Sequence, residues 1–252
     1  MPVLFPGGTR RRAVMSILVL VLVVGATTAW LVLPPRDGDP GGGAGHQGPL
    51  AEGRLEPGFH APGLETYYSG QVVRPDPETW TDVRPSSEYG VLVLADGRNE
   101  DTPRDPQVAI LVDAAQRWAR EDDRVELTIR YLTDPYTYID EVDRAAMSEE
   151  ADLIVTAGNR LVDPVAVVSA NYAGEDPQQF LVLGAEVAEP THNIAASDWQ
   201  GSAYLGEGVV ESDYYDPHAV TAPRAYAALR AGVAAVLSGY SGVIVRIPAD
   251  RY

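Results

Sequence analysis

The sequence predicts an α/β protein with a doubly wound, mostly parallel, flavodoxin-like sheet, preceded by an N-terminal transmembrane helix. From residue 89 to residue 247, short apolar runs of strand character alternate with helical patterns. Such alternation is typical of a parallel sheet covered by helices on both faces. Right-handed crossovers between parallel strands leave few strand orders, and we expect the flavodoxin-like one. The prediction of a transmembrane helix depends on an uncharged apolar stretch, residues 13–33.

The N-terminal stretch has the features of a signal anchor. Residues 1–12 end in three arginines, and residues 13–33 contain no charge before a Pro-Pro pair. As a helix, this stretch spans about 30 Å, the thickness of the bilayer's hydrocarbon core. The arginines predict a cytoplasmic N-terminus and an extracytoplasmic remainder, in a single-pass protein of the plasma membrane. A cleaved signal peptide, with a small-residue site at residues 27–29, is the alternative.

A linker separates this stretch from the domain. Residues 34–63 are rich in Pro, Gly and charge, which is typical of a flexible tether. The extracytoplasmic domain is expected to occupy residues 64–252. Its first part, residues 64–87, holds Tyr and Trp among polar residues, and we expect it to pack against the domain without joining the sheet.

The first half of the domain is predicted to contain two strand–helix units. Residues 89–95 form a continuous apolar strand, and residues 125–132 alternate like a strand. Residues 105–121 form a helix, opened by an Asp-Pro pair that supplies an N-cap and a first helical residue. Residues 137–150 form an amphipathic helix with acids in its first turn, where the helix dipole favours them.

The second half continues the alternation. Residues 152–157 are a strand, and Asp163 and Pro164 open a helix that reaches about residue 172. The remaining predicted elements are strands at 179–185, 193–198 and 242–247, a short helix at 200–210, and a helix at 222–239 that ends at Gly239.

Composition excludes several classes of function. The chain has no cysteine, which excludes disulfides, thiolate metal sites, a cysteine nucleophile and the lipidated cysteine of exported lipoproteins. Its formal net charge is −17, and because residues 1–36 carry four arginines and no acid, the remainder carries −21. Such an acidic surface repels the phosphate backbone of nucleic acids, and we therefore expect no nucleic-acid partner.

Candidate binding residues follow the strands. In an open parallel sheet, ligands bind at the C-terminal strand ends. Glycine in such a loop permits positive φ or close approach of a ligand, and an asparagine offers donors and acceptors. Each residue also has a structural alternative, as a turn glycine or a loop cap. The candidate ligand-binding residues are Asp96, Gly97, Asn99, Gly158, Asn159, Glu186, Asp198 and Trp199.

Catalytic motifs are scarce. The sequence has no G-x-G-x-x-G after its first strand, no P-loop and no G-x-S-x-G elbow in a strand–helix context. His192 has no carboxylate at metal-ligand spacing, and Asp213, Asp216 and His218 fit a tyrosine-rich surface loop better than a metal site. We therefore expect no catalytic residue, metal or cofactor. A carboxylate hydrolase using Asp96 and Asp198 is a minor alternative.

A series of short motifs between residues 151 and 208 resembles a known family. These motifs are Asp152-Leu153-Ile154, Gly158, Asp163-Pro164-Val165, Phe180-Leu181-Val182-Leu183-Gly184, Asn193-Ile194-Ala195 and Gly201-Ser202-Ala203-Tyr204-Leu205-Gly206. Their order resembles the basic membrane protein (BMP) family of bacterial ABC-transporter substrate-binding proteins, which are nucleoside-binding lipoproteins of the type I periplasmic binding fold. The resemblance implies that the strand ends contact a nucleoside or similar solute, with Asp96 and Gly158 at matching positions.

The chain departs from this family in three ways. Asp105-Pro106-Gln107 stands where the family has Phe-Asn-Gln, the lipidated cysteine is absent, and only 46 residues follow Gly206. The last departure implies a single lobe, which offers half a binding cleft. The leading hypothesis is a membrane-anchored, solute-binding-like protein beside an ABC permease. The alternative is a non-catalytic accessory domain that has lost solute binding and docks on a membrane complex.

Overall fold

The computed structural model describes residues 50–60, 68–97, 106–148, 151–203, 206 and 215–252. They belong to one compact unit, Asp39–Tyr252. The predicted transmembrane segment, residues 13–33, lies outside the described residues. Among the helices that are described, none has both the length and the apolar character needed to cross a bilayer.

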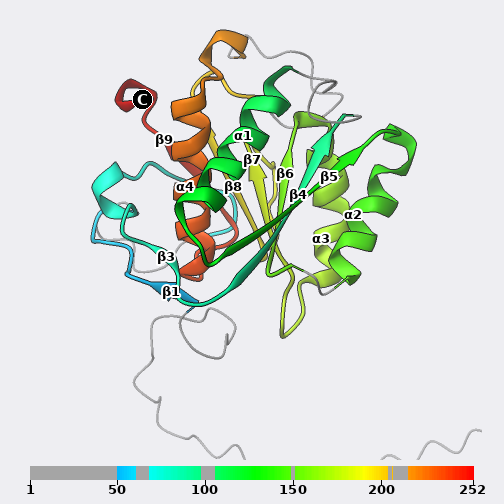
Figure 1. The fold of residues 1–252 in the computed structure, drawn as a ribbon, viewed down its shortest axis with the longest axis horizontal. Helices are drawn as coiled ribbons and strands as arrows, with labels where there is room; N and C mark the ends of the chain where they lie inside the picture. Colours follow the sequence, from blue (N-terminus) through cyan, green and yellow to red (C-terminus); the bar gives the residue numbers. More distant parts are fainter. Residues whose placement is uncertain (1–49, 61–67, 98–105, 149–150, 204–205, 207–214) are drawn as a thin grey trace, which may run out of the picture. The chain divides into compact units, whose positions relative to one another are not determined.

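A seven-stranded sheet forms the centre of the domain (Figure 1). Its strand order is β2-β9-β8-β7-β6-β4-β5, and every neighbouring pair is parallel. The strands are β2 (Gln71–Val73), β4 (Tyr89–Asp96), β5 (Val125–Leu132), β6 (Leu153–Ala157), β7 (Gln179–Leu183), β8 (Ile194–Trp199) and β9 (Val243–Ile247).

The expected α/β class and strand order are confirmed. Counted along the chain from β4, the strands β5-β4-β6-β7-β8 have the flavodoxin-like order, and β9 and β2 extend the sheet. The prediction that residues 64–87 stay outside the sheet is wrong, because β2 pairs with β9. This strand has only three residues, too few to show a period of two in the sequence.

Residues 50–60 are also part of the fold, although they fall in the segment predicted to be a linker. Strand β1 (Ala51–Glu52) pairs with β3 (Arg84–Pro85) in a small antiparallel sheet. The Phe59 side chain is buried, with its ring centroid 6.1 Å from that of Tyr240. The ordered domain therefore begins before residue 64.

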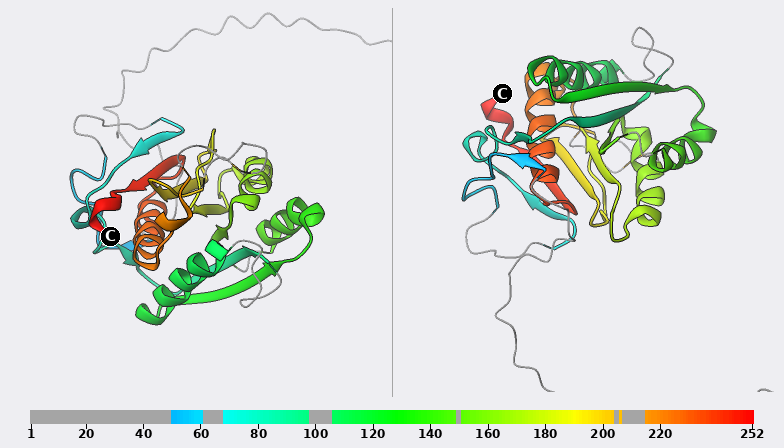
Figure 2. Two further views of the ribbon diagram at one scale, coloured as in Figure 1. Left: turned by 90° about the horizontal axis from the view of Figure 1, so that it is seen from above. Right: turned by 60° about the horizontal axis from the view of Figure 1, so that its bottom comes forward.

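Helices cover both faces of the large sheet (Figure 2). On one face, α1 (Pro106–Glu121) packs against α4 (Ala222–Leu237); on the other, α2 (Tyr138–Met147) packs against α3 (Val162–Ser169). Alternate strand residues divide between two buried clusters, because successive side chains of a strand point to opposite faces. In β4, Val91 and Val93 face α1, whereas Leu92 and Leu94 face α2 and α3.

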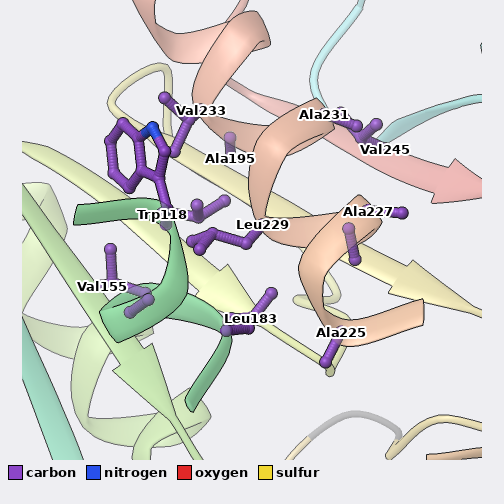
Figure 3. Packing of buried hydrophobic residues seen from close by; sticks show 14 of the residues in the cluster. Trp118, Val155, Leu183, Ala195, Ala225, Ala227, Leu229, Ala231, Val233 and Val245 are labelled. Atoms are coloured by element: carbon purple, nitrogen blue, oxygen red, sulfur yellow. The ribbon is translucent and has the colours of Figure 1, made fainter. Parts of the chain in front are cut away.

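The cluster under α1 and α4 is the larger of the two. Figure 3 shows Trp118 of α1 and Leu229 of α4 in it, and both side chains are fully buried. Burial of one such side chain contributes about 1.5–3 kcal/mol. Helix α4 approaches the sheet closely at Gly232. A Cβ added there would lie 2.6 Å from Leu181 Cδ1 and 2.9 Å from Ser197 Oγ, so this close approach requires glycine.

The helix boundaries differ slightly from those expected. Helix α3 begins at Val162 after a 3₁₀ turn, so Asp163 lies in its first turn and is not its N-cap. Pro164, the third residue of α3, is tolerated because the first four N–H groups of a helix have no partner within it. Most of the predicted helix at 200–210 lies outside the described residues.

Short 3₁₀ turns connect several of these elements. Among the described residues, they are Pro77–Thr79, Pro135–Thr137, Asn159–Leu161, Ala170–Tyr172, Pro217–Ala219 and Ala249–Arg251.

Candidate functional site

Five residues form one row across the C-terminal edge of the sheet. The ladders pair Ala95 with Ala157, Ala157 with Leu183 and Leu183 with Ser197. The residue after each of these four positions lies in the same row, which we call the terminal row. Strand β9 adds a fifth residue, because Arg246 pairs with Asp198 of β8. The terminal row comprises Asp96, Gly158, Gly184, Asp198 and Arg246.

Asp96 lies at one end of the terminal row and is 1% exposed. The Tyr138 hydroxyl, from the start of α2, donates a hydrogen bond to its Oδ1. The Arg160 Nε lies 3.6 Å from its Oδ2, and that guanidinium is partly exposed. The carboxylate thus has a neutral hydroxyl donor beneath the surface and a cation at longer range. Neighbouring Gly97 donates its N–H to Leu132 O at 3.0 Å, while Asn99 lies outside the described residues.

Gly158 connects this end of the terminal row to α1. Its φ is +119°, which disfavours any residue with a side chain. A Cβ at this position would lie 3.1 Å from Val108 Cγ2 and 3.3 Å from Asp96 Cβ. This glycine is therefore required for close packing of α1, whatever else the loop does.

Asn159 fixes a second loop above the edge. Its Nδ2 donates to Gly206 O and its Oδ1 accepts from Gly206 N, both at 3.1 Å. A Cβ at Gly206 would lie 2.5 Å from Asp163 Oδ1, so only glycine fits there. The donors and acceptors expected to meet a ligand are thus used to hold the chain after β8 over the start of α3.

The other end of the terminal row is an ionic centre formed by three side chains. The Arg246 guanidinium donates from Nε to Asp198 Oδ1 at 3.1 Å and from Nη2 to Asp198 Oδ2 at 2.8 Å. The same Nη2 also donates to Glu186 Oε1. Asp198 is 1% exposed, and burial raises its pKa to about 7, although Arg246 opposes the shift and the Glu186 charge adds to it.

Trp199 belongs to the core. It follows Asp198 in β8 and so points to the opposite face, where it joins the cluster under α1 and α4 with 2% of its surface exposed. A Cβ at Gly184 would lie 3.5 Å from its Cη2. The indole ring is therefore on the wrong side of the sheet to stack on a ligand bound beside Asp198.

Two residues that hold the buried acids, Tyr138 and Arg246, were not predicted from the sequence. The available signal for Arg246 was a charge in an otherwise apolar strand, which requires a partner when buried. Tyr138 gave no signal, because its position in a helical pattern suggests only a core residue. The described residues contain no group of three or more His, Asp or Glu side chains that could hold a metal ion.

A groove of about 740 Å³ lies at the opposite, N-terminal edge of the sheet. It is formed where α2 and α3 end and where β6 and β7 begin. Its lining residues are Leu50, Ala146, Met147, Ala151, Asp152, Asn171, Tyr172, Gly174, Glu175, Asp176, Pro177, Gln178 and Gln179. None of the residues predicted to bind a ligand lines this groove.

The sequence matches no family model and no curated protein. Among solved structures, it is similar to an ABC transporter solute-binding protein from Aeropyrum pernix, with 24% identity and a TM-score of 0.38 over 45% of this chain and 29% of that one. A second is a Peptoclostridium difficile fragment described as a lipoprotein, with 18% identity and a TM-score of 0.38 over 44% of this chain and 84% of that one.

A third similar structure is an ABC transporter solute-binding protein from Conexibacter woesei, with 20% identity and a TM-score of 0.33 over 44% of this chain and 35% of that one. The chain thus spans less than a third of the length of the Aeropyrum protein. None of the three is described as a basic membrane protein, so that family remains a resemblance. TM-scores this low establish neither family nor function.

Proposed function

We propose that this chain is a non-catalytic, solute-binding-like protein that takes a small polar solute at its terminal row. The observation that supports the proposal is the register of the sheet, which aligns Asp96, Gly158, Gly184 and Asp198 along one edge. Open α/β sheets bind ligands at this edge, beside the point where the strand order reverses. That reversal lies between β4 and β6, next to Asp96 and Gly158.

The spacing and chemistry of the terminal row suit a solute with several hydroxyl or amino groups. Three strand spacings separate Asp96 from Asp198, about 14 Å. Both acids already accept hydrogen bonds within the domain, and an ionised carboxylate offers about four acceptor sites. A nucleoside, whose ribose hydroxyls donate hydrogen bonds, is the solute that the family resemblance suggests.

The location and partners belong to the same proposal. Residues 13–33 would anchor the protein in the plasma membrane, with the domain extracytoplasmic and an ABC permease as its partner. An open sheet edge buries less of a solute than a closed cleft does, so we expect weak binding unless a partner covers the edge.

Thermal unfolding of the purified full chain with nucleosides and sugars tests this proposal. At millimolar ligand we expect at least one compound to raise the midpoint by about 2 °C or more, because a ligand that binds only the folded state stabilises it. The Asp198→Asn variant should lose this response, whereas the exposed control Asp123→Asn should keep it. A wild-type protein that responds to none of these solutes would count against the proposal.

The accessory-domain alternative is favoured by one specific observation. Asp96, Asp198 and Glu186 all accept hydrogen bonds from side chains of the domain itself, so the described edge is stable without a solute. Crosslinking in native membranes discriminates between the two functions. A docking domain should give one dominant protein adduct whose yield is unaffected by added solute, whereas a solute-binding module should show a solute-dependent pattern.

A further inference from the structure

The two lateral edges of the sheet differ greatly in length. Strand β2 closes one edge with three residues, whereas β5 forms the other with eight (Figure 2). An edge strand offers unpaired backbone groups to another chain, and proteins usually protect it by shortness, proline or a bulge. Strand β5 has the sequence VELTIRYL, which contains no proline and is rich in residues that favour strands.

The hydrogen bonds at the ends of β5 show which of its backbone groups face outward. Tyr89 donates its N–H to Arg124 O at 2.8 Å, and Gly97 donates to Leu132 O at 3.0 Å. In a parallel ladder, alternate residues bond to the same neighbour. The even-numbered residues of β5 therefore bond to β4, and the N–H and C=O groups of Leu127 and Ile129 point away from the sheet.

The side chains on one face of this edge carry complementary charges. Glu126, Thr128 and Arg130 alternate with the apolar residues that pack under α1. The pKa of Glu126 is raised because it shares a hydrogen bond with Glu88 and is repelled by its charge. Arg130 forms no hydrogen bond or ion pair with any other described residue. The edge thus presents an exposed acid, Glu126, and a half-buried cation, Arg130, four residues apart.

We infer that β5 pairs with β5 of a second copy of this chain, antiparallel, about a two-fold axis at Thr128. In this register Leu127 lies opposite the partner's Ile129, and both members of this pair have outward-facing backbone groups. Glu126 lies opposite the partner's Arg130 in a non-hydrogen-bonded pair, where side chains approach most closely. The symmetry repeats each of these contacts, so the interface contains two ion pairs and a continuous apolar face.

Neighbouring registers also allow the backbone hydrogen bonds of a ladder, but they do not place Glu126 opposite the partner's Arg130. An axis at residue 127 places Glu126 opposite the partner's Thr128, and an axis at residue 129 places Thr128 opposite the partner's Arg130. An axis between two residues pairs outward-facing backbone groups with inward-facing ones and forms no ladder. The axis at Thr128 is the register that fulfils both requirements, and it makes the edge complementary to itself.

Single cysteines test this register directly, because the natural chain has none. Under mild oxidation of the full chain, Thr128→Cys should form a disulfide-linked dimer, since directly opposed non-hydrogen-bonded residues have Cα atoms about 4.5 Å apart. Glu126→Cys, on the same strand, is the matched control and should form no disulfide-linked dimer, because this register places residue 126 opposite residue 130 and not opposite its own copy. Mixed with Arg130→Cys, it should form a heterodimer. Equal yields of linked dimer from Thr128→Cys and Glu126→Cys would overturn the inference.

Charge reversal tests the ion pairs without any crosslink. Arg130→Glu should weaken dimerisation about tenfold or more, because two attractive cross-strand pairs become repulsive. The double variant Glu126→Arg/Arg130→Glu restores opposite charges and should regain wild-type dimerisation within about threefold. Sedimentation velocity measures the dissociation constants, and thermal unfolding checks that each variant folds. A wild-type chain that stays monomeric at about 100 µM would refute the pairing.

Discussion

Asp96 and Asp198 occupy equivalent places in the terminal row, yet the domain stabilises them differently. Each is 1% exposed, and both side chains point to the face covered by α2 and α3. Asp96 accepts from the Tyr138 hydroxyl, with Arg160 at 3.6 Å, whereas Asp198 is bound by both Arg246 nitrogens that face it. Buried Asp96 accepts a hydrogen bond from a neutral donor, whereas buried Asp198 accepts from a cation that it shares with Glu186.

A charged partner does not remove the cost of burying Asp198, whose pKa stays raised beside Arg246. Burial is the main cause that raises the pKa of Asp198 to about 7, and Arg246 only partly opposes it. Arg246 also binds Glu186, whose charge raises the pKa of Asp198 further, so two acids depend on one guanidinium. Taking an ion out of water costs several kcal/mol, which one shared cation does not fully offset. The Asp198 centre should therefore respond more strongly than the Asp96 centre to mutation and pH.

Removal of the shared cation should have the largest effect. Arg246→Met keeps an apolar stem of similar length but leaves two acids beside each other, one of them buried. We expect the free energy of unfolding at pH 8 to fall by about 3–5 kcal/mol, as when one partner of a buried pair is removed. Denaturant unfolding measures this loss.

The control for this variant is Arg251→Met, at an exposed pair whose Arg251 Nη2 lies 3.6 Å from Asp76 Oδ1. Exposed pairs contribute at most about 1 kcal/mol. Equal losses in the two variants would show that Arg246 acts as a surface charge and not as the centre of a buried network.

Stability should depend on pH through Asp198. Its folded-state pKa is raised from 3.8 to about 7 by burial, so the unfolded chain releases this proton at a lower pH than the folded chain. The resulting penalty on folding is absent below pH 4, grows as the pH rises from about 4 to about 7, and then stays constant. Relative to Asp198→Asn, the wild type should gain up to about 4 kcal/mol as the pH falls from 8 to 4.

Unfolding of both proteins across this pH range measures the difference between their free energies. The variant serves as the reference because other carboxylates, which respond to acid in the opposite sense, titrate equally in both proteins. A difference that stays constant from pH 8 to pH 4 would mean that Asp198 remains ionised throughout.

The Asp96 centre should show an intermediate effect through its tyrosine. Tyr138→Phe removes the donor to a buried carboxylate, and we expect a loss of about 1–3 kcal/mol. Tyr89 is the matched control, since its side chain is also buried but its hydroxyl has no hydrogen-bond partner among the described residues. Tyr89→Phe should be neutral or slightly stabilising. Chemical unfolding of the two variants should therefore separate them clearly, and similar losses would contradict the role given to Tyr138.

The sequence predicts the main strands and helices well because each has enough residues to show its period. Strands β4 and β6 are continuous apolar runs, and α1 repeats its apolar face over sixteen residues. Strand β2 is too short for such a signal. The positions of Asp96 and Asp198 at strand ends were also predictable, since they follow directly from the strand boundaries.

The partners of these acids were not predictable, because they depend on three-dimensional register. Arg246 meets Asp198 only because β9 pairs with β8 in one particular register, and Tyr138 reaches Asp96 from a helix on one face. Trp199 shows the same limitation, since a shift of one residue along a strand moves a side chain to the other face. Sequence reasoning located the edge of the sheet but could not determine which side chains face each other there.

Substitution of Arg160 should have the smallest effect, and it tests whether Asp96 depends on a cation at all. The Arg160 side chain is 44% exposed and its Nε is 3.6 Å from Asp96 Oδ2, longer than a normal hydrogen bond. Solvent screens such a contact, so Arg160→Gln should lower the free energy of unfolding by less than about 1 kcal/mol. The ratio of this loss to that of Arg246→Met, measured under identical conditions, expresses the difference between the two centres. If the two losses were equal, Asp96 would also depend on an ion pair, and the contrast between a neutral and a charged partner would disappear.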